Sequence, residues 1–579
     1  MTGRIVIRLP RLAGCRALLA IALAGFGCAA QAQTPQMRNY RPDPVTQDRS
    51  FQGSPLQPNA DRGAKPTVEV PTLRAPSAAA LPGSALPSFR LTALAVEGAM
   101  TVPPEAIAAT YAERVGTLVT IADIAAIADA ITALYRNAGY HLSRAIVPPQ
   151  DIRDGRIRIT VIEGSIEDVV VRGPGKDLAA VRAMLAPVAA ERPAQRKTLE
   201  RALLNINDLP GFRVADSTLE EIGTASGRFR LLVIVEAWKL YWSQGIDNFG
   251  STSVGPLQAY SSLAVNSLFI GGDTLAVAGS TVPDDTNALA FGRAVYDMPI
   301  GTDGARLGAS VLQSATRPAE TRFLRDTART TTYELRGSIL PLQTRATSLR
   351  LTAAASTSDI TEGLTLGTLY HDHINTVSLA ADLRMKDDFN GWNYLTLIVR
   401  QGFGGTRSND IMASIYGASG DFTALNGAYV RIQKLTDAWS LKFAGTAQIA
   451  SGPMLLSQQY FLGAAAFGPG YYTNDNGIGG TLELRWDQDT NWALLKGYQL
   501  YGFTDGGQVW SSHGGNYAAL ASVGAGARFF INEQLQAGVA VAFPVYNQFD
   551  NGDLRDYRIL FSVLNAFKMC PSRPDLLCG

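Results

Sequence analysis

The chain has 579 residues, too many for one ordinary domain, and its net charge is only +1. With 17% charged residues, this balance implies no strongly basic face, so nucleic acid is not an expected partner. After the N-terminus there is no run of about 18 or more apolar residues, which excludes a helical membrane protein. A membrane barrel stays open, because its strands are short and alternate between apolar and polar residues.

The first 87 residues show no pattern of a folded domain. Residues 1–32 predict a secretory signal peptide, because arginines precede the apolar segment Ala17–Ala30 and Ala30-Gln31-Ala32 fits a cleavage site. The apolar segment is too short for a transmembrane anchor. Residues 33–87 are rich in Pro, Ala, Ser, Gln and Arg without periodicity, which predicts a disordered or extended linker.

Residues 88–165 predict a small α+β module that contains one clear helix. Isoleucine and leucine recur every three or four positions over Ile121–Leu134, as on one apolar helical face. Thr120 suits the N-cap of this helix, with Asp123 completing a capping pair. Gly139 suits the left-handed residue that ends it.

Two strands are predicted after this helix. Residues 145–147 form a short strand that ends at Pro148, since proline cannot donate to a sheet ladder. Asp154-Gly155 signals a hairpin turn. Residues 156–161 alternate between polar and β-branched side chains, as in a strand with one buried face.

The letters of this stretch are more specific than its periodicity. From Tyr135 to Gly164 the chain reads Y-x-x-x-G-Y-x-x-S-x-A-x-V-P-x-Q-x-I-x-x-G-x-I and closes in V-I-E-G. This run closely resembles the first periplasmic POTRA domain of two-partner secretion translocators, outer-membrane proteins that export one large partner protein. The resemblance implies a role in substrate capture for Tyr135, Gly139, Tyr140, Pro148, Gln150 and Gly155.

Residues 166–237 predict a second copy of the same unit. Ile166–Gly173 repeats the strand and glycine that open the first module. The stretch Leu199–Gly211 resembles the second POTRA signature of the family, with a helix that proline and glycine stop. That signature singles out Asn207, Asp208, Pro210 and Gly211. Glu200, Arg201, Asn207 and Asp208 are either substrate contacts or belong to a solvated helix surface and a helix C-terminus, and we favour the second alternative.

From about Trp238 to Phe567, short alternating segments recur between turn residues. For example, Trp439, Leu441 and Phe443 alternate with polar residues. Period-two alternation is typical of a membrane barrel with a polar lumen, and about 330 residues at roughly 20 per strand give about 16 strands. A soluble array of β-sandwiches is the weaker alternative. The predicted fold is therefore a membrane β-barrel of about 16 antiparallel strands, residues 238–567, preceded by two small α+β periplasmic POTRA domains.

Polar residues between the apolar ones are expected to face the lumen. Arg431, Gln433 and Lys442 would keep an extended polypeptide solvated there. Glu483 and Arg485 would also face inward, since their apolar neighbours would face lipid.

The barrel region also resembles that of the same translocators, in which loop six folds into the lumen. There, an arginine at the loop tip pairs with the aspartate of an F-x-D-x-G strand. In this chain Pro469 stands in place of that arginine, so Asp505 lacks its expected partner. We expect water to hydrate Asp505 in the lumen. The alternatives are that a nearby arginine such as Arg485 pairs with Asp505, or that this chain has no ion pair between loop six and the wall. The resemblance implies a functional set of Pro469, Gly470, Tyr471, Glu483, Phe503, Asp505 and Gly507.

The sequence carries no recognisable enzyme motif, and neither an enzymatic activity nor a cofactor is expected. His371-Asp-His373 has no third ligand, so a loop turn is favoured over a metal site. Residues 568–579 form a tail with Cys570 and Cys578. An oxidising compartment allows a disulfide between these cysteines, with two free thiols as the alternative.

The resemblance implies a monomeric translocator in the outer membrane of a Gram-negative bacterium. Its expected partners are outer-membrane lipid and a secreted exoprotein with an N-terminal secretion domain. Two alternatives stay open. An insertase of the same superfamily would tend to carry more POTRA modules and the loop-six arginine, and a passive pore would need no POTRA module.

Overall fold

The computed structural model describes most of the chain after residue 87. The described residues are 88–152, 154–173, 178–319, 322–324, 326–365, 367–406, 413–415, 417–492, 494–515, 517–532, 534–549, 556–570 and 573–577. The predicted signal peptide, residues 1–32, and the predicted linker, residues 33–87, lie outside them. Within the described part, no helix is long and apolar enough to cross a membrane.

The first module is a three-stranded sheet with strand order β2-β5-β4, covered by a long helix. Its elements are β1 (Phe89–Arg90), β2 (Ala93–Glu97), α3 (Pro104–Ala109), the 3-10 turn η1 (Ala112–Arg114), β3 (Leu118–Val119), α4 (Ile121–Asn137), β4 (Arg144–Ile146) and β5 (Arg156–Ile162). The predicted helix start is confirmed, because Thr120 and Asp123 form a capping box. The left-handed residue at its end is also confirmed, since Gly139 has a φ of 93°.

The second module repeats a three-stranded sheet, with strand order β6-β8-β7. Its elements are β6 (Ser165–Arg172), α5 (Leu178–Ala190), α6 (Arg196–Asp208), β7 (Phe212–Glu221) and β8 (Arg228–Ala237). The core includes the fully buried Phe229, Leu231 and Ile206. Leu142 of the first module also belongs to this core. The two modules therefore share apolar packing.

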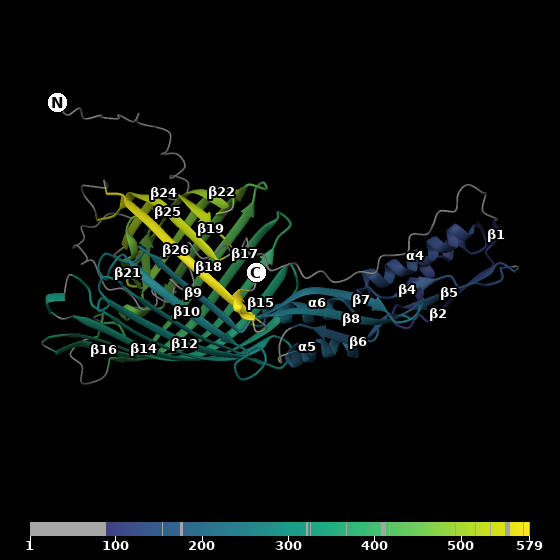
Figure 1. Cartoon of the computed structure of the whole chain (residues 1–579), viewed down its shortest axis with the longest axis horizontal. Coiled ribbons are helices and arrows are strands. Elements are labelled where there is room, and N and C mark those ends of the chain that lie inside the picture. The colour runs from purple at the N-terminus through teal and green to yellow at the C-terminus, as the bar shows by residue number, and fades with distance from the viewer. Residues whose placement is uncertain are drawn as a thin grey trace, which may run out of the picture. The chain divides into compact units, whose positions relative to one another are not determined.

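Sixteen antiparallel strands close into one barrel, which confirms the predicted strand number (Figure 1). They are β9 (Leu240–Asp247), β10 (Gln258–Asn266), β11 (Thr274–Thr281), β12 (Leu289–Ile300), β13 (Ala305–Thr316), β14 (Thr327–Gln343), β15 (Thr347–Leu364), β16 (Gly367–Lys386), β17 (Gly391–Thr406), β18 (Phe422–Lys434), β19 (Trp439–Ala450), β22 (Asn476–Trp492), β23 (Leu495–Trp510), β24 (Tyr517–Phe530), β25 (Leu535–Asn547) and β26 (Arg558–Cys570). The barrel closes where β26 pairs with β9, from Ser562 opposite Asp247 to Met569 opposite Leu240.

The shorter elements lie between or after these strands. They are the 3-10 turns η2 (Arg322–Leu324) and η3 (Leu456–Gln458), the strands β20 (Tyr460–Ala464) and β21 (Gly468–Asn474), and β27 (Arg573–Leu577). β26 runs three residues past the predicted barrel end at 567, and β27 pairs back onto it. Cys578 lies outside the described residues, so its disulfide with Cys570 stays a prediction.

The alternation of side chains follows the predicted pattern on β22. Leu482 and Leu484 are 43% and 42% exposed, whereas Glu483 and Arg485 between them are each 3% exposed. Lys442 lies directly opposite Glu483 and shares its inward face. The barrel therefore presents apolar residues outward and polar residues inward, as a membrane barrel requires.

The prediction that Arg431 and Gln433 face the lumen is wrong. Arg431 lies directly opposite Phe443, an outward residue that is 43% exposed, and opposite residues share one face. The Arg431 guanidinium reaches the turn after β16, where its Nη1 lies 2.6 Å from Asp387 Oδ2. It thus extends along the outer surface toward the polar rim, as long basic side chains do at membrane interfaces.

Candidate functional site

The buried residues of the first POTRA-like signature hold the module together. Tyr135 is fully buried, and its hydroxyl donates to Glu163 Oε1 over 2.8 Å. Glu163 also accepts hydrogen bonds from the Met100 and Thr101 N–H groups, at 2.9 and 2.7 Å. Burial would raise the pKa of Glu163, but these donors outweigh it and hold the pKa below its usual value. The ring of Tyr140 packs edge-on against Tyr135, with centroids 6.1 Å apart.

Gln150 and Gly155 shape the loop between β4 and β5. The Gln150 side chain accepts from the Arg158 N–H at 2.7 Å and donates to the Arg158 carbonyl at 2.8 Å, so it replaces a neighbouring strand. It also donates to the Pro148 carbonyl over 3.2 Å. Gly155 has a φ of 66°, and a Cβ there would lie 2.0 Å from the Arg90 carbonyl oxygen. These residues fix the loop beside β5, the central strand of the sheet.

The second signature joins the second module to the barrel. The Asn207 carboxamide accepts from the Val214 N–H over 2.6 Å, across the turn of Pro210 and Gly211. Asp208 forms an ion pair with Arg350 of β15. A Cβ at Gly211 would lie 2.6 Å from the Trp238 carbonyl oxygen, where the chain enters β9.

Two further residues of α6 make the same connection. Glu200 accepts from the Arg345 N–H at 3.0 Å, and Arg201 donates to the Leu340 carbonyl at 2.7 Å. The solvated surface is therefore wrong for Glu200 and Arg201, because they contact the barrel instead. The helix C-terminus is confirmed for Asn207 and Asp208, the last two residues of α6, and Asp208 also contacts the barrel. The sequence missed this, since the β14–β15 turn lies about 140 residues away.

The strands β20 and β21 form a two-stranded hairpin that packs against the inner wall of the barrel. Glycines in the wall make room for it. A Cβ at Gly477 would lie 2.1 Å from the Tyr460 ring, and one at Gly507 would lie 2.8 Å from Leu462 Cδ1. Residues 460–474 include no charged residue, so this seat depends on apolar packing and hydrogen bonds.

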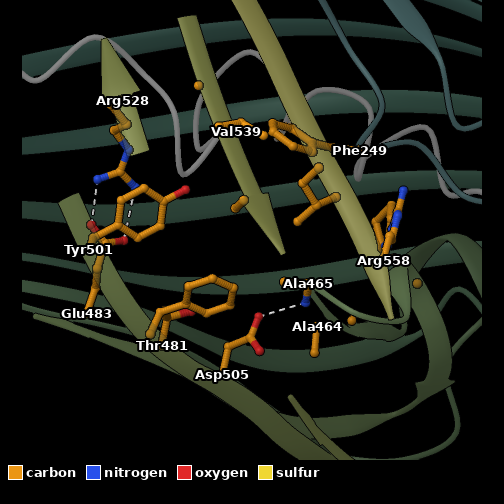
Figure 2. Close-up of a pocket in the computed structure, with 18 of the residues that line it drawn as sticks. Phe249, Ala464, Ala465, Thr481, Glu483, Tyr501, Asp505, Arg528, Val539 and Arg558 are labelled. Carbon is orange, nitrogen blue, oxygen red and sulfur yellow. Dashed lines mark hydrogen bonds and ion pairs between the residues drawn. The ribbon is translucent and has the colours of Figure 1, made fainter. Parts of the chain in front are cut away.

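Asp505 has two partners in the lumen. Its Oδ2 accepts from the Ala465 N–H of the hairpin over 2.7 Å, and its Oδ1 accepts from the Ser522 hydroxyl of β24. Figure 2 shows the carboxylate pointing at the Ala465 nitrogen. The expectation of a hydrated Asp505 is therefore wrong, and so is the substitute Arg485. A main-chain amide takes the position of the expected arginine.

The charged side chains of the wall near Asp505 pair with one another instead of with the hairpin. Glu483 Oε1 lies 2.6 Å from Arg528 Nη1 of β24 and 2.6 Å from Arg485 Nε. The Arg528 guanidinium also stacks on Tyr501, 3.8 Å from the ring centroid. All three charged side chains are buried. The sequence reasoning missed Arg528, Tyr501 and Ser522. A signal was available, because every second residue of β23 and β24 faces the lumen and these three residues lie at such positions.

The other predicted residues of the loop tip lie on different sides of the hairpin. Pro469 is exposed, and Gly470 has a φ of 63°, which glycine adopts without strain. Tyr471 packs on Phe467, with centroids 5.1 Å apart, away from Asp505. Phe503 faces the lumen beside Asp505, and a Cβ at Gly524 would lie 2.4 Å from its ring. The structure thus brings Phe503, Asp505 and Gly507 together with the hairpin, whereas Tyr471 contacts another part of the wall.

The outer end of the barrel closure carries two further side chains that sequence reasoning missed. Asn248 donates to the Ile559 carbonyl and accepts from the Phe561 N–H, both over 2.8 Å. Arg558 donates to the Asn248 and Gly250 carbonyls at 2.6 and 2.7 Å. Arg558 also lies against the hairpin, since a Cβ at Gly468 would be 2.9 Å from its Nη1. We call Asn248 and Arg558 the seam clasp.

The histidine pair lies in regular structure. His371 and His373 belong to β16, so the predicted loop turn is wrong. His373 Nδ1 lies 2.8 Å and His371 Nε2 lies 3.3 Å from Asp359 Oδ1. Among the described residues, no group of three or more His, Cys, Asp or Glu side chains could hold a metal ion.

Comparisons with known proteins agree with this architecture. Residues 89–164 match the ShlB-type POTRA domain family. The chain is 23% identical over 554 residues to the heme/hemopexin transporter protein HuxB of Haemophilus influenzae, covering 89% of this chain and 94% of that protein. It is 28% identical over 207 residues to the outer membrane transporter CdiB of Escherichia coli, covering 34% of this chain and 33% of CdiB.

Solved structures show the same fold. The structure of CdiB from Escherichia coli matches with a TM-score of 0.71 and 20% identity, covering 93% of this chain and 100% of that one. CdiB from Acinetobacter baumannii matches with a TM-score of 0.62 and 14% identity, covering 90% and 98%. In its ShlB-type POTRA module, its nearly full-length similarity to a transporter and its closed sixteen-stranded barrel, the chain is similar to the two-partner secretion translocators of the outer membrane.

Proposed function

We propose that this protein captures an unfolded partner exoprotein in the periplasm and exports it through the barrel. The observation that carries the proposal is the combination of a ShlB-type POTRA module with a closed barrel whose lumen holds an uncharged hairpin. An extended polypeptide can add to an exposed sheet edge of a POTRA module, which binds it through main-chain hydrogen bonds. The expected partner carries an N-terminal secretion domain.

The inner wall supports passage of an extended chain. Inward polar side chains such as Lys442 can hydrogen-bond a polypeptide main chain, which no apolar wall would do. The hairpin seat contains no ion pair, so moving the hairpin breaks hydrogen bonds and apolar contacts but separates no pair of opposite charges. The hydrogen bonds include those from the Ala465 N–H to Asp505, between the Tyr460 and Thr446 hydroxyls, and from the Tyr472 hydroxyl to Asn547. Folding of the partner outside the cell would then bias its movement outward.

The remaining assignments are part of the same proposal. Residues 1–32 would direct export of the chain itself, residues 33–87 would be a linker, and residues 166–237 would form a second POTRA domain. The signature residues of both modules would support capture by holding the sheet edges in place. The protein would work as a monomer in contact with outer-membrane lipid.

The test compares secreted and cell-surface proteins with and without the gene. Loss of one large β-rich protein, with all other outer-membrane barrels unchanged, supports a dedicated translocator and names its partner. A fall in many barrel proteins would support an insertase instead. No change in either set would contradict export and leave a passive pore.

Deletion of residues 89–237 provides the matched control. The shortened protein should still insert and conduct ions, because the barrel closes on its own strands. It should export nothing, because capture is lost. Normal export by the shortened protein would contradict a role for the modules.

A further inference from the structure

The lumen contains a cavity that neither the hairpin seat nor the buried ion pair fills. Its volume is about 330 Å³. One side is the hairpin, the second is the wall of β22 to β24, and the third is formed by β25, β26 and Phe249. Figure 2 shows Phe249 and Arg558 on one side of this space, with Asp505 and the Glu483–Arg528 pair on the others.

The lining combines apolar and charged side chains. Phe249, Phe461, Phe503 and Leu560 supply rings and a branched side chain. Asp505 and Arg558 also line it, as does the Glu483–Arg528 pair, so acceptors and donors border these apolar side chains. Small-molecule sites commonly have this composition, with few polar groups around an apolar interior.

The size fits one large side chain together with its main chain. A cavity of roughly 150 Å³ holds a benzene ring, and the present cavity is about twice that size. A polypeptide main chain carries both donors and acceptors, which suits the carboxylate and guanidinium groups of the lining.

We propose that this cavity binds an aromatic or large aliphatic side chain of the extended polypeptide during export. The inference rests on the proposed function and adds a binding position on the export route of the polypeptide through the lumen. Binding there would place the passing chain beside Ala465 and Pro469, where it could compete with the hairpin for the wall. Each apolar residue that enters would then delay backward movement.

The test uses single-channel recordings of the full-length protein with two synthetic peptides. The probes are Ser-Thr-Phe-Thr-Ser and Ser-Thr-Ala-Thr-Ser, which differ only in the central side chain. We expect the phenylalanine peptide to block the current about tenfold longer, because burial of its ring adds that factor to binding. Equal block times for the two peptides would overturn the inference.

Filling the cavity should remove this difference. Ala540→Phe fills the cavity from β25 and Thr481→Phe fills it from β22. If one variant does not form channels, the other can be used for the same measurement. The control is Ile398→Phe on β17, because Ile398 lies between the outward Leu397 and Val399 and does not line the cavity. A control that abolishes the difference as fully as Ala540→Phe would mean general narrowing of the lumen, and would overturn the site.

This outcome is distinguishable from failure of the proposed function. If gene deletion changes no secreted protein, export fails as a proposal, whereas selective block by the phenylalanine peptide would still establish the cavity as a binding site. If export is established and the two peptides block equally, the site fails and export stands.

Discussion

Asp505 and Glu483 are two carboxylates in one lumen with opposite roles. Asp505 holds the hairpin, because its partner is a main-chain amide of that hairpin. Glu483 holds the wall, because its partners Arg528 and Arg485 are both wall residues. A proline at position 469 removes a cation from the hairpin without leaving either carboxylate unpaired. The contacts that hold the hairpin are thereby separate from the ion pairs that hold the wall.

Replacing Asp505 should release the hairpin while leaving the barrel folded. A hydrogen bond to a charged group contributes about 1.5–3 kcal/mol, so Asp505→Ala should raise the population of the released hairpin by roughly tenfold or more. We expect larger and more frequent open-channel currents in planar bilayers. Asp505→Asn is the matched control, since its amide oxygen can still accept from the Ala465 N–H. Identical currents for the alanine variant and the wild type would contradict this role.

Breaking the wall ion pair should instead destabilise the barrel. Removing one partner of a buried pair leaves an uncompensated charge, at a cost of about 3–5 kcal/mol. Arg528→Met and Glu483→Gln should therefore each lower the unfolding midpoint of the purified protein in detergent. The double variant should lose less than the sum of the two, because Arg528 and Glu483 are then removed together and neither is left facing the other's vacancy, although Arg485 still loses Glu483. Strictly additive losses would show that the two side chains do not depend on each other.

At the scale of elements, the two small modules behave as one unit. Leu142 of the first module packs in the core of the second, and Arg144 pairs with Glu221 over 2.7 Å. The Arg196 N–H donates to the Gly139 carbonyl over 2.9 Å, which ties the start of α6 to the end of α4. A joint with apolar packing, an ion pair and a main-chain bond leaves little freedom between the modules.

His141 makes this joint sensitive to acid. Its burial, together with the charge of Arg196, lowers the pKa of His141 to about 4 against an ordinary value of 6.5. In the folded protein His141 is therefore neutral at neutral pH. The stability of the joint between the modules is complete above about pH 6.5 and falls between pH 6.5 and 4, because the unfolded chain binds the proton more readily. The loss is up to about 3 kcal/mol, or about 1.4 kcal/mol per pH unit.

Hydrogen exchange of the full-length protein measures this effect. After correction for the intrinsic pH dependence of exchange, protection of the β6–β8 amides should fall between pH 6.5 and 4.5. His141→Phe should flatten that dependence, because no proton can then bind at this position. A steep decline that persists in the variant would assign the acid sensitivity to another group, such as Glu163 or Glu221.

The sequence predicts elements better than it predicts contacts. The capping box of α4, the glycine at its end and the strand number follow from local patterns, so each could be stated from the chain alone. The partner of Asp505 could not, because Ala465 contributes only its main-chain N–H, which every non-proline residue has. Arg431 was assigned to the wrong face because Val430 and Ile432 next to it are as apolar as lipid-facing residues, and only pairing with Phe443 fixes the face.

At the scale of the whole molecule, the barrel is closed by its first and last strands. β9 and β26 are joined by main-chain pairs from Asp247 to Leu240, and near the inner end Trp242 stacks on Phe567 with centroids 5.4 Å apart. At the outer end the ladder stops, and the seam clasp of Asn248 and Arg558 continues it with side-chain hydrogen bonds. Closure therefore depends on side chains at the one end where the hairpin also lies.

Removing the seam clasp should open the outer end of the closure and loosen the hairpin together. Asn248→Ala leaves the Phe561 N–H and the Ile559 carbonyl without this partner, and Arg558→Gln shortens the side chain that lies against Gly468. Each hydrogen bond lost contributes about 1 kcal/mol, so the double variant should exchange the Phe561 amide roughly tenfold faster or more. Amides of the hairpin should exchange faster in Arg558→Gln than in Asn248→Ala, since only Arg558 touches both parts.

Trp242→Leu is the matched control for this experiment, because it removes the ring contact near the opposite end of the same strand pair. It should speed exchange near Phe567 and leave the hairpin unchanged. Equal effects of the control and the clasp variants on the hairpin would mean that the closure loosens as a whole. An effect confined to the clasp variants would show that Arg558 couples hairpin position to barrel closure, so that a polypeptide displacing the hairpin also acts on the barrel seam.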